Sequence, residues 1–375
     1  MPERTRRQHQ HPDRSRLTIQ LRSIRTNRGS VLGVDVSERT PLTTIGITAF
    51  NAVGTIADAV TSALQQRWAP IEVVVVDDAS TDGTATRLEE LSAADDRIRL
   101  IRHERNQGAA ATRNTIVRHA RGEFIAFFDD DDYSLPDRVT AQVDRLTAYE
   151  ARFADGQRVA CYAAREGRFP DGRTLVLPVL GTDTDMPGPH GPDLVAHLML
   201  GLGIAGVGGE APACSLLARR TTFEHVGGFD PHFRRCDDTE FNVRLARSGG
   251  HLIGVRHPHV RQLIAATGDK PLWLERSMHL GVLEKHASAI ADPWAFAAAR
   301  RWLHARYDWF EGEHAAAARH LGMAFVLKPG NTATRAVRAL PNLRWHRGLR
   351  RAHASFGLDS APRRLAATDE RAEPQ

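Results

Sequence analysis

The 375-residue sequence has only three cysteines, Cys161, Cys214 and Cys236, and no apolar run long enough to cross a membrane. Three widely spaced cysteines cannot form a disulfide framework, and their spacing does not match a zinc site. The most apolar stretch, residues 194–209, contains His197 and five glycines, whereas a spanning helix needs about 20 apolar residues. The N-terminus has the charge of a signal peptide without the apolar segment that follows in one. These absences predict a reducing, cytoplasmic location.

Positive charge is concentrated at the two ends of the sequence. The chain has 50 Lys and Arg against 45 Asp and Glu, a net charge of +5 and a pI near 9.5. Residues 1–28 hold eight arginines and residues 331–351 hold six, so the middle of the chain is closer to neutral. Basic ends can contact anionic lipid or nucleic acid, but solvated tails are the commoner explanation. We therefore expect a basic N-terminal tail over 1–40, a flexible tail over 356–375 and no nucleic-acid partner.

From residue 41 the spacing of apolar residues alternates between that of a strand and that of a helix. Strands are predicted over 42–50, 71–78, 98–102 and 124–128, and helices over 56–66, 84–91 and 109–120. Short connections between alternating strands and helices favour an open, mostly parallel sheet flanked by helices. The expected fold class is therefore α/β.

Polar residues occur at the ends of three of these strands. Thr48 lies near the end of the first strand, Asp77 and Asp78 end the second, and Asp129–Asp132 follows the fourth. In open α/β sheets, ligands bind beyond the carboxyl ends of the strands. We therefore expect these three polar clusters to be neighbours along one edge of the sheet.

The four consecutive aspartates Asp129–Asp132 follow the apolar strand FIAFF. Neighbouring like charges repel one another, so a cation or a solvated surface is needed to hold them together. On an extended segment the side chains of Asp129 and Asp131 fall on one side and can share a hard divalent cation, while Asp130 points elsewhere. A solvated turn with caps for a helix near Pro136 explains the same residues. The position after a buried strand favours the metal interpretation.

Three further clusters each have a functional and a purely structural interpretation. In VVVVDDASTDGT, Asp78 and its polar neighbours either hydrogen-bond a base or ribose or form a capped turn. In CDDTEFNVRLARSGG, Asp237 and Asp238 either cap a helix or supply an ionised carboxylate that acts as a general base. His257 and His259 alternate like strand residues, and each is either a metal ligand or a structural histidine.

Taken in order, these segments resemble the family 2 inverting glycosyltransferases, which have the GT-A fold and use nucleotide-sugar donors. The matching segments are ITAFN, VVVVDDASTDGT, NQGAAATRN, FIAFFDDDDYSLPDR, SLLARR, GGFD and CDDTEFNVRLARSG. The resemblance covers residues 43–250. It implies an enzyme that moves a sugar from a nucleotide-diphosphate sugar to a hydroxyl of a glycan, a lipid-linked molecule or another acceptor, with Mg²⁺ or Mn²⁺ as cofactor.

The resemblance also implies a division of the chain. Residues 41–150 would bind the donor, residues 151–265 would bind the acceptor and carry the catalytic base, and residues 266–355 would form a helical C-terminal region. The residues expected around the nucleotide are Thr48, Phe50, Asp77, Asp78 and Asp130, with Asp130 at the ribose.

Chemical roles follow for three carboxylates. Asp129 and Asp131 match the metal-binding DxD pair of the family, and Asp238 matches the catalytic base. Asp237 stands where the family usually has Glu, and Glu240 where it usually has Asp, which puts the acceptor geometry in doubt.

Two other functions fit parts of the sequence. A nucleotidyltransferase can use a similar sheet, but ITAFNAVGTIADA lacks a Gly-rich phosphate loop with Lys. A degenerate, nucleotide-binding scaffold protein whose helical tail does the work is the non-enzyme alternative. Residues 336–351 interleave apolar residues with arginines, as an interfacial helix on the inner face of a membrane does, although packing on the core explains the same pattern.

Overall fold

The computed structural model describes residues 40–169, 172–204, 208–264 and 271–339. The two expected tails and most of the segment 336–351 lie outside these residues. Within the described part of the chain, no helix is both long enough and apolar enough to span a bilayer.

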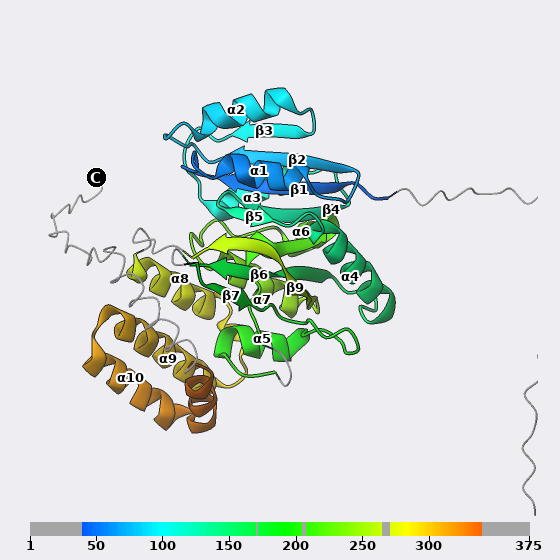
Figure 1. The fold of residues 1–375 in the computed structure, drawn as a ribbon. Helices are drawn as coiled ribbons and strands as arrows, with labels where there is room; N and C mark the ends of the chain where they lie inside the picture. Colours follow the sequence, from blue (N-terminus) through cyan, green and yellow to red (C-terminus); the bar gives the residue numbers. More distant parts are fainter. Residues whose placement is uncertain (1–39, 170–171, 205–207, 265–270, 340–375) are drawn as a thin grey trace, which may run out of the picture. The chain divides into compact units, whose positions relative to one another are not determined.

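The first half alternates strand and helix, as the sequence predicts (Figure 1). Its elements are β1 (Thr43–Ala49), α1 (Ile56–Leu64), β2 (Ile71–Asp77), α2 (Thr84–Ala94), β3 (Ile98–Arg102), α3 (Ala109–His119) and β4 (Phe124–Asp129). β1 pairs in parallel with β2 and β4, and β2 pairs in parallel with β3. The expected parallel α/β arrangement is confirmed.

The second half extends the same sheet. Its elements are β5 (Asp132–Ser134), α4 (Arg138–Arg152), β6 (Val159–Arg168), β7 (Thr174–Leu177), α5 (Gly191–Leu200), η1 (Ala213–Ser215), β8 (Leu216–Arg219), α6 (Arg220–Val226), α7 (Asp237–Arg247) and β9 (His251–Leu263). β8 is antiparallel to both β4 and β6, whereas β6 and β9 are parallel. The strand order is β3-β2-β1-β4-β8-β6-β9-β5, with β7 paired to β6.

β4 is buried on both faces of the sheet, which explains its unbroken apolar run. Ile125 and Phe127 belong to one core cluster, and Phe124 and Phe128 belong to the other. The ring of Phe127 packs edge-on against that of Phe223, with 5.4 Å between centroids. A strand held from both sides fixes the position of the aspartates that follow it.

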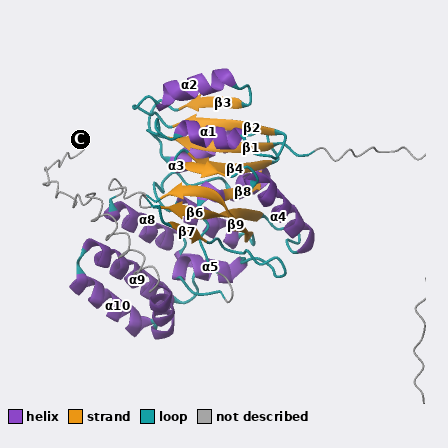
Figure 2. Cartoon of the chain, viewed as in Figure 1, coloured by secondary structure: helices purple, strands orange, loops and turns teal. Residues whose placement is uncertain are grey.

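The helical C-terminal region expected from the sequence is confirmed (Figure 2). It contains α8 (Leu272–Lys285), η2 (Ala287–Ala289), α9 (Pro293–Glu311), α10 (His314–Leu327) and a helical segment over 329–339. α9 begins after Asp292, whose carboxylate accepts a hydrogen bond from the Trp294 N–H at 2.9 Å. It ends at Gly312, which adopts a left-handed φ of 88°.

Candidate active site

The carboxyl ends of three neighbouring strands bring the predicted polar residues to one edge of the sheet. Thr48 of β1 pairs with Asp129 of β4, and Ala49 of β1 pairs with Asp77 of β2. This neighbourhood follows from parallel pairing, since parallel strands end at the same edge. The register of the strands therefore brings the three polar clusters together, as expected.

Phe50 and Asp130 are joined directly. The backbone N–H of Phe50 donates to Asp130 Oδ2 at 2.8 Å, and the Phe50 side chain is 47% exposed. An exposed ring beside the end of a sheet is available to pack against a flat ligand. The next residue, Asn51, ties the two loops of the edge together, because its N–H donates to Ser80 Oγ at 2.9 Å and its side chain accepts from the Thr81 N–H at 2.9 Å.

Asp77 and Asp78 both organise loops at this edge. The carboxylate of Asp78 accepts from the N–H groups of Gln107 and Gly108 at 2.9 and 2.7 Å, and it contacts His103 Nδ1 at 2.7 Å. Asp77 is fully buried and accepts from the Ser80 N–H at 3.1 Å. The loop contacts of Asp78 join β2 to the segment before α3, a long-range role that local sequence patterns do not reveal.

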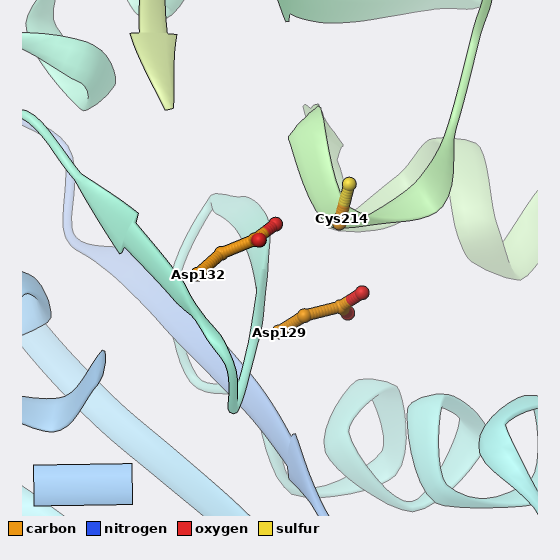
Figure 3. A group of neighbouring side chains, drawn as sticks. All are labelled: Asp129, Asp132 and Cys214. Atoms are coloured by element: carbon orange, nitrogen blue, oxygen red, sulfur yellow. The ribbon is translucent and has the colours of Figure 1, made fainter. Parts of the chain in front are cut away.

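The aspartate run turns rather than running straight. β4 ends at Asp129, Asp130 and Asp131 form a turn, and β5 starts at Asp132. The expected alternation of side chains along an extended segment therefore does not apply. The turn directs Asp129 and Asp132 toward Cys214 of η1, and their ligand atoms all lie within 4.8 Å of one another (Figure 3). Asp131 is exposed, and its pairing with Asp129 on one ion stays a prediction.

The electrostatics of this cluster suit a bound cation. Burial raises the pKa of Asp132 well above its usual range, and the charges of Asp129 and Asp131 raise it further. Burial likewise raises the pKa of Asp130 to about 7, although the hydrogen bond from the Phe50 N–H lowers this pKa. Asp132 Oδ1 is buried without a hydrogen-bond partner among the described residues. Carboxylate oxygens are the ligands that Mg²⁺ and Mn²⁺ prefer, so two of the three groups fit either ion, and the buried Cys214 thiol fits least well.

The predicted base stands at the start of α7. Cys236 adopts a left-handed φ of 61°, and Asp237 and Asp238 form the first turn of the helix. Asp237 is bound to Arg113 of α3, with Nη1 and Oδ2 2.5 Å apart. The other terminal nitrogen of Arg113 lies 3.5 Å from Asp129 Oδ1. One buried side chain therefore connects the end of β4 to the helix that carries the predicted base.

Arg113 was not predicted from the sequence, although it lies in the segment NQGAAATRN. The available signal was a single arginine within a helix that packs on a sheet. Burial lowers the pKa of Arg113, but the carboxylates of Asp237, Asp129 and Asp238 together raise it above its usual value. Arg113 therefore stays charged within the site and screens these carboxylates from one another.

Asp238 lines a cavity of about 440 Å³. Burial raises the pKa of Asp238, and Arg113 and the N–H of Thr239 oppose that rise. A carboxylate with a raised pKa is a stronger proton acceptor when it is ionised. Asp131 and Asp132 line a second hollow of about 290 Å³.

Glu240, one of the two departures from the family pattern, has a structural role. Its side chain is fully buried and contacts Arg244 of the same helix, Lys285 at the end of α8 and His286 directly after α8. Burial raises the pKa of Glu240, but these partners outweigh burial and lower it to about 2. Glu240 thus fastens the helix of the predicted base to the C-terminal helices.

Comparison with known proteins finds relatives of part of the chain. Residues 44–200 match the family model described as glycosyl transferase family 2. The chain is 39% identical over 145 residues to the succinoglycan biosynthesis protein ExoO of Rhizobium meliloti, covering 38% of this chain and 41% of that protein. It is 36% identical over 115 residues to the UDP-Glc:alpha-D-GlcNAc-diphosphoundecaprenol beta-1,3-glucosyltransferase WfgD of Escherichia coli, covering 31% and 45%. The chain thus spans less than half the length of these relatives.

Solved structures show the same fold at low identity. The S. aureus TarS 1–349 structure in complex with UDP-GlcNAc aligns with a TM-score of 0.54 and 16% identity, over 86% of this chain and 93% of that one. TarS 1–349 alone aligns with a TM-score of 0.51 and 17% identity over the same shares. The fold is that of the GT-A glycosyltransferases. Residues 44–200 belong to glycosyl transferase family 2.

Proposed function

We propose that the protein transfers a sugar from a nucleotide-diphosphate sugar to an acceptor hydroxyl, with inversion at the anomeric carbon. The observation that carries the proposal is the position of Arg113, which contacts Asp129 at the donor edge and Asp237 beside the predicted base. One side chain that reaches both groups supports a single site in which donor and acceptor meet. The names of relatives from R. meliloti and E. coli support a place in polysaccharide or cell-envelope synthesis.

At the donor end, Thr48, Phe50 and Asp78 surround the nucleotide base, with Asp77 behind them and Asp130 at the ribose. Asp129 and Asp131 hold Mg²⁺ or Mn²⁺, and the convergence of Asp132 on Asp129 supports its joining them. The bound cation supplies neutralising charge to the diphosphate leaving group.

At the acceptor end, Asp238 takes the proton of the acceptor hydroxyl as that oxygen attacks the anomeric carbon. The new bond joins the anomeric carbon to the acceptor oxygen, and the bond from that carbon to the diphosphate oxygen breaks. The nucleoside diphosphate leaves with the bonding electrons, and the proton stays on Asp238. Attack from the face opposite the leaving group inverts the configuration.

A thermal-shift screen tests the donor half of the proposal. UDP-, GDP- and dTDP-sugars are each added with Mn²⁺ or with EDTA to wild type, Asp131→Ala and the surface control Asp96→Ala. We expect one nucleotide class to stabilise wild type and the control only with Mn²⁺, by about 2.7 kcal/mol at 100 times its Kd. Asp131→Ala should lose this stabilisation. The absence of any shift in wild type would contradict the donor half of the proposal.

The acceptor and the location stay open to experiment. A glycan or lipid-linked acceptor and a peripheral position on the inner face of the membrane both belong to this proposal. Deletion of residues 331–375 should abolish co-sedimentation with anionic liposomes, if the basic C-terminal segment makes that contact. Unchanged co-sedimentation would show that residues 331–375 do not make the membrane contact.

A further inference from the structure

The cavity that holds Asp238 is closed on one side by the C-terminal helices. Its lining includes His279 of α8, Arg306 of α9 and Arg335 of the helical segment 329–339. These residues follow the part of the chain that matches the family model, which ends at residue 200. The C-terminal helices therefore contribute side chains to the same cavity as the predicted base.

Arg306 and Arg335 lack an acidic partner among the described residues. Several other buried arginines are held by hydrogen bonds, as Arg165 is by Glu210 and Arg138 by two backbone carbonyl groups. Arg306 lies over two aromatic rings of its own helix, and Arg335 lies 5.3 Å from the ring centroid of Trp302. Arg306 is exposed and Arg335 is partly buried, and both line the cavity without a carboxylate of the described residues beside them.

Arg335 packs against the end of α5 in the cavity wall. Its Nε lies 2.6 Å from the position that a Cβ on Gly201 would occupy. Gly201 has a left-handed φ of 62° at the end of α5, so this position favours glycine and leaves room for the guanidinium. Burial and the neighbouring charge of Arg306 lower the pKa of Arg335 to about 9. An anion bound between the two guanidinium groups would relieve both effects.

The carboxylates in the cavity lining do not balance this charge. Of the two, Glu210 is already paired with Arg165, which leaves Asp238. Nδ1 of His279 lies 2.6 Å from the Tyr307 hydroxyl. Burial, and after it the charge of Arg306, lowers the pKa of His279. A histidine side chain supplies no negative charge to offset the two arginines. A volume of about 440 Å³ lies within the range of small-molecule sites. The cavity is thus large enough for a small ligand, and the carboxylates of its lining do not fully offset the charges of its two arginines.

We propose that Arg306 and Arg335 bind a phosphate or diphosphate group carried by the acceptor, whose hydroxyl is presented to Asp238 in the same cavity. This inference rests on the proposed function and specifies its acceptor class. Two guanidinium groups match the charge of a phosphate or diphosphate ester better than that of a single carboxylate. The phosphate can belong to a soluble glycosyl phosphate or to a lipid-linked one, such as the diphosphoundecaprenol named in one relative.

Isothermal titration calorimetry on the full chain tests this assignment. The probes are glucose 1-phosphate, farnesyl diphosphate and neutral glucose, all in EDTA so that the donor site binds no metal. The variants are Arg306→Gln with Arg335→Gln, each single change, and the control Arg319→Gln, which removes the same charge from the exposed surface of α10. Circular dichroism of each variant establishes that it is folded.

We expect wild type and Arg319→Gln to bind at least one phosphorylated probe, and glucose much more weakly. The double variant should bind that probe at least about tenfold more weakly. The more tightly bound of the two phosphorylated probes identifies the soluble or the lipid-linked source. If the double variant does not fold, Arg306→Gln alone, which changes an exposed side chain, should still weaken binding several-fold.

Equal affinity in wild type and the folded arginine variants would overturn the inference, as would the lack of binding of either phosphorylated probe to wild type. The Mn²⁺-dependent stabilisation by a nucleotide sugar is measured separately in the double variant and should be retained. Lack of probe binding by wild type, with its donor stabilisation intact, would therefore count only against the inference, whereas the absence of donor stabilisation in wild type would count against the proposed function.

Discussion

Replacing Glu240 by Gln should destabilise the protein more than any surface carboxylate change does. The Glu240 carboxylate is fully buried among Arg244, Lys285 and His286. The lowering of its pKa from 4.5 to about 2 corresponds to about 3 kcal/mol in favour of the ionised form in the folded protein. Removing the carboxylate also takes this partner from the partly buried Arg244 and from Lys285, and breaking a buried pair typically costs about 3–5 kcal/mol.

The pH dependence of this effect has a defined sign. Because the folded pKa of Glu240 is below its unfolded value, its contribution is fully present above pH 4.5 and is lost as the pH falls toward 2. The difference in unfolding free energy between wild type and Glu240→Gln should therefore be about 1 kcal/mol smaller at pH 3.5 than at pH 7. Urea unfolding at both pH values measures it.

Glu224→Gln provides the matched control. Glu224 is half-exposed and pairs with Arg220 one turn away in α6, and such surface pairs contribute about 0.5 kcal/mol or less. A loss below about 1 kcal/mol for Glu240→Gln at pH 7, or a loss that is the same at both pH values, would refute the reasoning.

Three further predictions concern the site. Because burial raises the pKa of Asp238, kcat/KM should rise with pH through a midpoint above the ordinary value of about 3.9, and a midpoint at or below that value would contradict the assignment. Arg113→Gln should move this midpoint upward, since Arg113 lowers the pKa of Asp238; an unchanged pH–rate profile would show that Arg113 does not act on the base. Asp132→Asn should raise the melting temperature in EDTA, because it removes a buried carboxylate near Asp129, and should reduce the stabilisation by Mn²⁺; a lower melting temperature in EDTA would argue against an uncompensated charge there.

The sequence predicts the first half of the fold closely because its signals are local. The strand over 98–102 and the helix starting at Ile56 are observed at the expected residues, since β-branched runs and helical spacing depend only on nearby residues. For Asp129–Asp132 the sequence left both an extended segment and a turn open, because repulsion among like charges gives no preference between them.

The contacts that join the site depend on distant parts of the chain. Arg113 and Asp237 are 124 residues apart, and their ion pair follows from where α3 and α7 pack, which no local pattern contains. The entry of Arg306 and Arg335 into the cavity of Asp238 likewise depends on how the C-terminal helices fold back on α5 and α7. Residue types near the strand ends therefore predicted which polar groups meet at the sheet edge, but not which distant side chains contact them.

The most direct test of the central claim is the rate at which a nucleotide sugar is converted to nucleoside diphosphate by wild type and by Asp238→Asn, with the donor found in the thermal-shift screen. We expect the variant to turn over about 10²–10⁴-fold more slowly, with its Mn²⁺-dependent stabilisation by the donor unchanged. An Asp238→Asn protein that turns over at the wild-type rate would contradict the assignment of the base and, with it, the proposed mechanism.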